Sequence, residues 1–157
     1  MAPFAYPSAS RFGDGLAGVY YAGDALATAI AEVSFHRERF ARSTPTPPMD
    51  FDERVIEADI DADLVDLRRE SATSALYDPD PANYTGARIV AKKARVAGAH
   101  GLVYNSVRRP GGECVAVFAP RLIVDARTTG YIGLRWDGKR IIDHFRKESL
   151  TAPYPSM

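Results

Sequence analysis

The sequence predicts an α+β domain in which a mostly antiparallel sheet is flanked by helices. Two stretches have helical periodicity, and several short stretches are rich in the β-branched and aromatic residues that favour strands. The helices and strands do not alternate regularly, as they would in a parallel βαβ protein. Short glycine-containing turns join two pairs of strands, and such turns connect antiparallel neighbours.

Bulk composition restricts the classes of function. The 157 residues favour one domain, residues 1–157, with a core from about 11 to 146 and peripheral ends at 1–10 and 147–157. Twenty basic and twenty acidic side chains give a formal net charge of zero, which argues against nucleic-acid binding. A single cysteine, no bilayer-length apolar run and no secretory signal indicate a cytoplasmic, bacterial-style protein that does not enter membranes.

The first third of the chain predicts a glycine-rich loop, a strand and a helix. Gly13, Gly15 and Gly18 favour a loop that bends tightly or approaches a ligand closely. Residues 19–22 are aromatic and β-branched, as in a strand. A helix is expected to run from an N-cap at Asp24 to residue 42. Its apolar face has the spacing of successive helical turns and comprises Leu26, Ala29, Ile30 and Val33.

The middle of the chain predicts two strands and the second helix. After a proline-rich loop at 43–50, strands are expected at 54–60 and 64–67. The second helix should span 84–97, with Gly98 as its C-terminal cap. No aromatic residues are interleaved with the basic residues of this helix, so they are interpreted as a solvated face. These basic residues are Arg88, Lys92, Lys93 and Arg95.

The last third of the chain predicts two hairpins. In the first, a turn at 109–112 joins strands at 101–106 and 113–119. In the second, Asp137-Gly138 joins strands at 131–136 and 139–145; this dipeptide is the strongest short hairpin signal in the chain.

Several familiar catalytic patterns are absent. Ser106 lacks the Gly-x-Ser-x-Gly setting of a hydrolase nucleophile. Three scattered histidines and one cysteine match no metal-ligand spacing, so no metal is expected. The glycine loop is neither a Walker loop nor a dinucleotide fingerprint.

A coherent set of polar residues remains: Arg11, Tyr20 or Tyr21, Glu32 and Ser106. An arginine can grip a diphosphate, and a tyrosine can stack on a nicotinamide or adenine ring. A carboxylate can stabilise the positive charge that develops as an N-glycosidic bond breaks, and a serine can fix a ribose or carboxamide. The structural alternative is an Arg11–Glu32 ion pair, packing tyrosines and a serine that begins a turn.

Two segments resemble the RES domain family. They are RFGDGLAGVYYAGDALATAIAEVSFH, residues 11–36, and GAHGLVYNSVRRPGGECVAVFAP, residues 98–120. The family is named for an arginine, a glutamate and a serine, which correspond to Arg11, Glu32 and Ser106. The resemblance implies a fold similar to that of ADP-ribosyltransferases, with a cleft that holds NAD⁺ as substrate.

The resemblance also implies a function and a set of residue roles. RES proteins are toxins of bacterial type II toxin–antitoxin systems, and their Xre-like antitoxins are expected to block the cleft. Catalysis would rest on Arg11, Glu32 and Ser106, and NAD⁺ would also contact one of the tyrosines. Two further residues are expected at the NAD⁺ site: Asn105 and Arg108. The acceptor of ADP-ribose stays open between a protein, phosphate and water. A non-enzymatic binding module, in which Arg11, Glu32 and Ser106 are structural, is the alternative.

Overall fold

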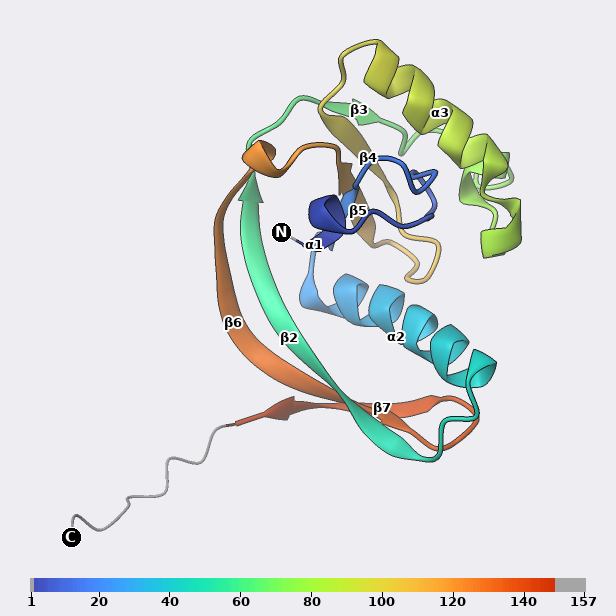
Figure 1. Ribbon diagram of the computed structural model, residues 1–157, viewed down its shortest axis with the longest axis vertical. Helices are drawn as coiled ribbons and strands as arrows, with labels where there is room; N and C mark the ends of the chain where they lie inside the picture. Colours follow the sequence, from blue (N-terminus) through green and yellow to red (C-terminus); the bar gives the residue numbers. More distant parts are fainter. Residues whose placement is uncertain (1, 149–157) are drawn as a thin grey trace, which may run out of the picture. The chain divides into compact units, whose positions relative to one another are not determined.

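The computed structural model describes residues 2–148 and confirms a mixed α+β fold with antiparallel sheets and flanking helices (Figure 1). The helices are α1 (Ala2–Ala5), α2 (Leu26–Ser43) and α3 (Thr85–Val96), with 3-10 turns at Ala75–Tyr77, Pro81–Asn83 and Pro120–Leu122. The strands are β1 (Tyr20–Gly23), β2 (Met49–Ile60), β3 (Leu64–Asp66), β4 (Gly101–Asn105), β5 (Glu113–Val117), β6 (Ile123–Trp136) and β7 (Ile141–Lys147). No helix within residues 2–148 is long and apolar enough to cross a membrane.

The chain divides into two compact units. Unit 1 comprises residues 1–35 and 58–125, and unit 2 comprises residues 36–57 and 126–157. The predicted peripheral tail at 147–157 lies almost wholly outside the described residues.

Unit 1 is built on a four-stranded sheet in the order β1-β5-β4-β3. Strands β4 and β5 form the expected hairpin, with Asn105 opposite Glu113, and β1 adds antiparallel to β5. Strand β3 pairs with β4 in parallel, which local turn signals did not predict. Helix α3 packs against the core of this unit through Ala87 and Ala91, whose side chains are fully or almost fully buried.

Two apolar clusters stabilise unit 1. The larger joins Phe12 and Val19 to buried residues of β4, β5 and α3, with Leu102 and Ala116 fully buried. The second surrounds Val117, and Phe4 from the N-terminal lead-in packs against it. Part of the lead-in thus contributes to the core of unit 1.

Unit 2 contains the end of α2, most of β2 and the β6–β7 hairpin. The predicted turn is confirmed: Asp137 Oδ1 accepts the N–H groups of Lys139 and Arg140, and Gly138 has the positive φ of 98° that glycine tolerates. Opposite Phe145, a residue larger than Gly133 would clash with the aromatic ring. Near the end of β6, every second side chain is buried, namely Ile132, Leu134 and Trp136, because neighbouring side chains of a strand point to opposite sides.

The observed bounds differ most from the predicted ones at the starts of two strands. Strand β2 begins at Met49 instead of residue 54, inside the segment expected to be a loop. Strand β6 begins at Ile123, eight residues before the predicted start at 131. Both extensions belong to the sheet in the order β2-β6-β7, and pairing supplies hydrogen bonds that local propensity does not reveal.

Candidate functional site

Glu32 and Ser106 lie together. Ser106 follows the end of β4, and Glu32 is on the half-buried flank of α2. The Ser106 hydroxyl donates to Glu32 Oε1 at 2.7 Å. Two residues separated by 74 positions are thereby joined by a hydrogen bond to a charged acceptor, which is stronger than a bond between neutral groups.

Local backbone geometry orients this hydroxyl. Ser106 Oγ accepts the N–H of Arg108 at 3.2 Å and of Arg109 at 3.0 Å. A hydroxyl has two acceptor positions and one donor, so these contacts leave its proton directed at Glu32. Ser106 therefore begins a turn, as the structural alternative expected, and also holds the carboxylate.

Cys114 is beside the same carboxylate. Its Sγ is 3.8 Å from Glu32 Oε1, and its side chain is 3% exposed. Burial first, and then the negative charge of Glu32, raise the pKa of the Cys114 thiol to about 12. The thiol is therefore protonated at neutral pH and is a poor nucleophile.

Arg11 lies in the loop between α1 and β1, residues 6–19, which we call the Arg11 loop. Only 8% of the Arg11 side chain is exposed. Its Nη1 donates to the carbonyl oxygens of Leu76 at 2.8 Å and Asp78 at 3.0 Å, and Nη2 donates to the Tyr84 hydroxyl at 3.2 Å. The expected alternative, an Arg11–Glu32 ion pair, is wrong: no carboxylate in residues 2–148 is ion-paired with Arg11. A buried cation compensated only by dipoles is a favourable partner for an anionic ligand.

The two tyrosines of β1 face opposite sides, as neighbouring strand residues must. Tyr20 packs against the cluster around Val117. The Tyr21 hydroxyl exchanges a hydrogen bond with Ser10 Oγ at 2.8 Å and accepts the N–H of Phe12 at 2.9 Å. Tyr21 thus lies on the side of the sheet that faces the Arg11 loop.

Arg108 and Arg11 share Tyr84 as a partner. The Tyr84 hydroxyl accepts from Arg108 Nη2 at 3.4 Å as well as from Arg11, and the Arg11 guanidinium lies 4.2 Å from the centre of the Tyr84 ring. Arg108 also donates to the Pro79 carbonyl oxygen at 2.5 Å and lies 3.3 Å from the centre of the Phe35 ring. Tyr84 is 5% exposed, and it connects the loop after β4 to the Arg11 loop.

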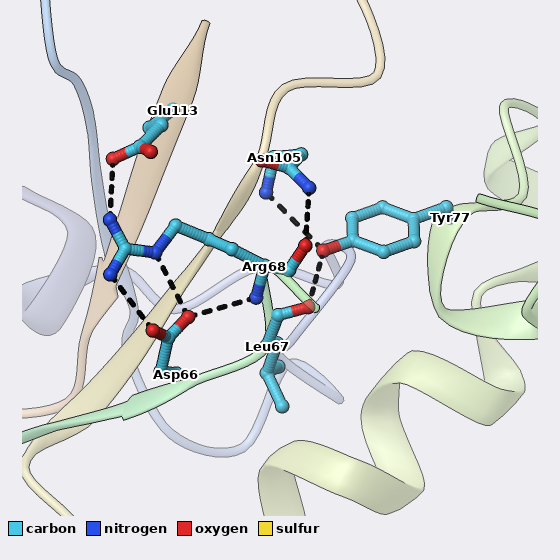
Figure 2. Close-up of polar contacts among 6 residues, drawn as sticks. All are labelled: Asp66, Leu67, Arg68, Tyr77, Asn105 and Glu113. Atoms are coloured by element: carbon cyan, nitrogen blue, oxygen red, sulfur yellow. Dashed lines mark hydrogen bonds and ion pairs between the residues drawn. The ribbon is translucent and has the colours of Figure 1, made fainter. Parts of the chain in front are cut away.

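A clamp formed by Asp66, Arg68, Tyr77 and Glu113 lies around Asn105 at the end of β4 (Figure 2). Asn105 Nδ2 donates to the Arg68 carbonyl oxygen at 2.8 Å, and its backbone N–H donates to the Tyr77 hydroxyl at 3.3 Å. The Arg68 guanidinium forms ion pairs with Asp66 at 2.8 Å and with Glu113 at 2.9 Å, and so joins β3 to β5 across the end of β4. The clamp restrains the residue immediately before Ser106.

A second connection ties α2 to the loop after β4. Arg109 Nη1 donates to Thr28 Oγ1 at 3.1 Å, and Thr28 Oγ1 donates to Asp24 Oδ1 at 2.6 Å. A side chain at Gly112 would approach Thr28 Oγ1 to 2.7 Å, so glycine is required for this close contact. Thr28 is fully buried and precedes Glu32 by one helical turn, so the two contacts fix one face of α2 against the loop. Asp24 binds this side chain; helix α2 itself begins at Leu26.

A comparison with known protein families tests the resemblance to the RES domain. A family model described as the RES domain matches residues 1–137. The chain belongs to the RES domain family. The match extends beyond residues 11–120, over which the two segments resemble the family, and includes the N-terminal lead-in. A search of curated proteins finds no match.

The predicted residues of this RES domain occupy distinct positions. The structure joins Glu32 to Ser106, fixes Asn105 beside Ser106, and places Arg11 and Arg108 on Tyr84. Their functional roles stay predictions. Sequence reasoning missed Tyr84, Cys114 and the Thr28–Arg109 contact, because no local motif marks them.

Proposed function

We propose that this RES domain binds NAD⁺ and cleaves the bond between nicotinamide and ribose. The observation that carries the proposal is the Glu32 carboxylate held by the Ser106 hydroxyl at 2.7 Å, in a chain of the RES family. A carboxylate fixed by a directed donor is preorganised to meet positive charge as it develops on a substrate.

The residues present fit a substrate that carries a diphosphate. A guanidinium has five N–H donors, and Arg11 uses three of them on Leu76, Asp78 and Tyr84. Five minus three leaves two donors, one on Nε and one on Nη2, with no protein partner among residues 2–148. Two donors on neighbouring nitrogens suit the bidentate recognition of a phosphate.

The proposed chemistry divides the work among these side chains. As the glycosidic bond breaks, its electron pair goes to the nicotinamide nitrogen and neutral nicotinamide leaves. Glu32 would stabilise the positive charge left on the ribose, and Ser106 would keep the carboxylate in place. Tyr21, on the Arg11 side of the sheet, is the tyrosine we assign to NAD⁺, and Asn105 and Arg108 would border the site.

The acceptor of ADP-ribose is a protein side chain, phosphate or water. Incubation with NAD⁺ labelled in its adenosine half distinguishes them: a labelled protein band supports transfer to a target. Free ADP-ribose supports hydrolysis, and its phosphate ester supports phosphorolysis. Omission of phosphate from the buffer abolishes only the last reaction.

The proposed biological role is that of a cytoplasmic toxin paired with an Xre-like antitoxin that blocks the site. Expression of the domain alone in a bacterium is then expected to stop growth, and co-expression of the protein encoded by the adjacent gene should restore it. Harmless expression of a folded domain that does not bind NAD⁺ would contradict both the toxin and the enzyme assignments.

The decisive test replaces Glu32 with glutamine, which keeps the size and removes the charge. Nicotinamide release is expected to fall roughly a hundredfold or more, because an electrostatic contact made in the transition state is lost. Glu70→Gln makes the same change at an exposed position of unit 1 and should leave the rate unchanged. Equal rates for the wild type and Glu32→Gln would refute the assigned role.

A non-enzymatic binding module is the second candidate, and the burial of Arg11 favours it. Three hydrogen bonds to protein atoms give Arg11 a structural role whether or not it binds a ligand. In this case NAD⁺ would not raise the melting temperature of the wild type. An enzyme that binds NAD⁺ would be stabilised by it, in proportion to the logarithm of ligand concentration above the dissociation constant.

A further inference from the structure

Unit 1 has a concave site that is not lined by Glu32 or Ser106. Its cavity volume is about 330 Å³, and it lies between the glycine-rich loop and α3. The loop contributes Phe12 and Leu16, and the helix contributes basic side chains together with Ile89. Arg11, Glu32 and Ser106 do not line it. The cavity is within the size range of small-molecule pockets.

Three cations converge on this cavity. Arg88, Lys92 and Arg95 line it and are spaced by four and three residues, which places them on one face of α3. None of them forms an ion pair with a carboxylate in residues 2–148. Asp14 also lines the cavity, but its carboxylate accepts the N–H of Leu16 at 2.9 Å. The lining therefore carries an excess of positive charge.

Two of these cations are held in position by the loop itself. Arg88 Nε donates to the Ser10 carbonyl oxygen at 2.9 Å, and Arg95 Nη2 donates to the Gly18 carbonyl oxygen at 2.9 Å. Each guanidinium is anchored by this hydrogen bond and has further N–H donors to offer a ligand. This geometry is preorganised for a ligand, because little side-chain entropy is lost when the donors are already placed.

Arg95 provides independent support for an anionic ligand. Its guanidinium lies 3.9 Å from the centre of the Phe118 ring and is half-buried. Burial lowers the pKa of Arg95, because a charge is costly where water is scarce, and the negative charge of Asp14 only partly offsets this effect. A bound anion would offset this cost of burying the Arg95 charge.

We propose that this cavity binds the phosphate group of a small phosphorylated molecule. Lys92 and the two arginines would contact the phosphate, and Phe12, Leu16 and Ile89 would contact an apolar or aromatic part of the same molecule. The inference does not depend on the proposed NAD⁺ cleavage, since none of these residues belongs to that site.

The test is a titration of ¹⁵N-labelled full-length protein with inorganic phosphate, AMP and adenosine at constant ionic strength. Phosphate and AMP, up to about 20 mM, should shift the amide signals of residues 13–17 and 88–95, and AMP should bind more tightly. Adenosine alone should bind weakly, because it lacks the charged group. Shifts confined to residues around Arg11 and Ser106 would show that phosphate binds at the other site and would overturn the proposal.

Matched variants on one helix test the assignment further. Lys92→Gln should weaken AMP binding about tenfold, the effect of losing one charged contact. Lys93→Gln makes the same charge change at the next position, which is exposed and does not line the cavity, and should leave the affinity unchanged. Both lysines are exposed, so both variants should fold. Equal weakening by the two substitutions would mean non-specific attraction to a basic helix and would refute a built site.

Discussion

Replacing Thr28 with valine removes a hydroxyl from a fully buried position while keeping the shape of the side chain. The valine methyl can neither donate to Asp24 nor accept from Arg109, so the hydrogen bonds at 2.6 and 3.1 Å are both lost. A hydrogen bond that involves a charged group contributes about 1.5–3 kcal/mol. Asp24 is exposed and Arg109 is half-buried, so both can turn to water after the substitution, and each lost bond is expected to cost only about 1 kcal/mol. We expect a loss of about 2 kcal/mol in the free energy of unfolding.

This loss is measurable by urea denaturation and by thermal melting. For a chain of this length, about 2 kcal/mol corresponds to a decrease of roughly 4–8 °C in melting temperature. Thr28→Ser is the matched control: it keeps the hydroxyl and loses the methyl packed near Gly23 and Gly112, at a cost of about 1 kcal/mol. If Thr28→Ser proved less stable than Thr28→Val, methyl packing and not hydrogen bonding would hold the start of α2.

The same substitution has a predictable pH dependence. The hydrogen bond from Thr28 is the main cause that lowers the pKa of Asp24 below its ordinary value of 3.8. A carboxyl group whose folded pKa is lowered adds stability above the unfolded pKa and loses it as the pH falls through the folded value. The difference in stability between the wild type and Thr28→Val should therefore be largest above about pH 4 and shrink in more acidic solution. A difference that grew on acidification would contradict this reasoning.

Three further predictions concern the residues around the candidate site. Tyr21→Phe should cost about 1 kcal/mol of stability through lost hydroxyl contacts, whereas Tyr20→Phe should cost little; equal melting temperatures would refute the distinction. Cys114 in the native protein should resist alkylation at pH 8, measured by mass, because burial raises the pKa of its thiol to about 12; rapid labelling would contradict the buried position. Arg68→Gln should raise the pKa of Asp66 toward 3.8, measured by carboxyl NMR, because hydrogen bonds from Arg68 lower it. A lowered carboxyl pKa adds stability above the unfolded pKa and loses it in acid, so the wild type should be more stable than Arg68→Gln near neutral pH and lose this difference at low pH. An unchanged pKa of Asp66 in the variant would contradict the ion pair between Arg68 and Asp66.

The sequence predicts correctly those helices and turns that depend on neighbouring residues in the chain. The hairpin turn at Asp137-Gly138 requires a positive φ at a position where the sequence supplies glycine. Helix α3 has apolar residues at helical spacing, and its predicted bounds differ from the observed Thr85–Val96 by one residue at each end. Strand β2 was predicted too short, because its first residues alternate acidic side chains with a single aromatic, Phe51. Their strand conformation depends on pairing partners far along the chain.

For the candidate site too, the sequence predicts the residues and the tertiary structure decides their contacts. Sequence alone identified Arg11, Glu32 and Ser106 as chemically coherent and, through their motifs, the RES family to which the chain belongs. Tertiary structure decided that Glu32 binds Ser106 and not Arg11, and that Tyr21 is the tyrosine facing the Arg11 loop. The sequence shows directly which residue types are present. A hydrogen bond between residues 74 positions apart, however, depends on how strands and helices pack. That packing is set by burial and sheet pairing, which no single stretch of sequence contains.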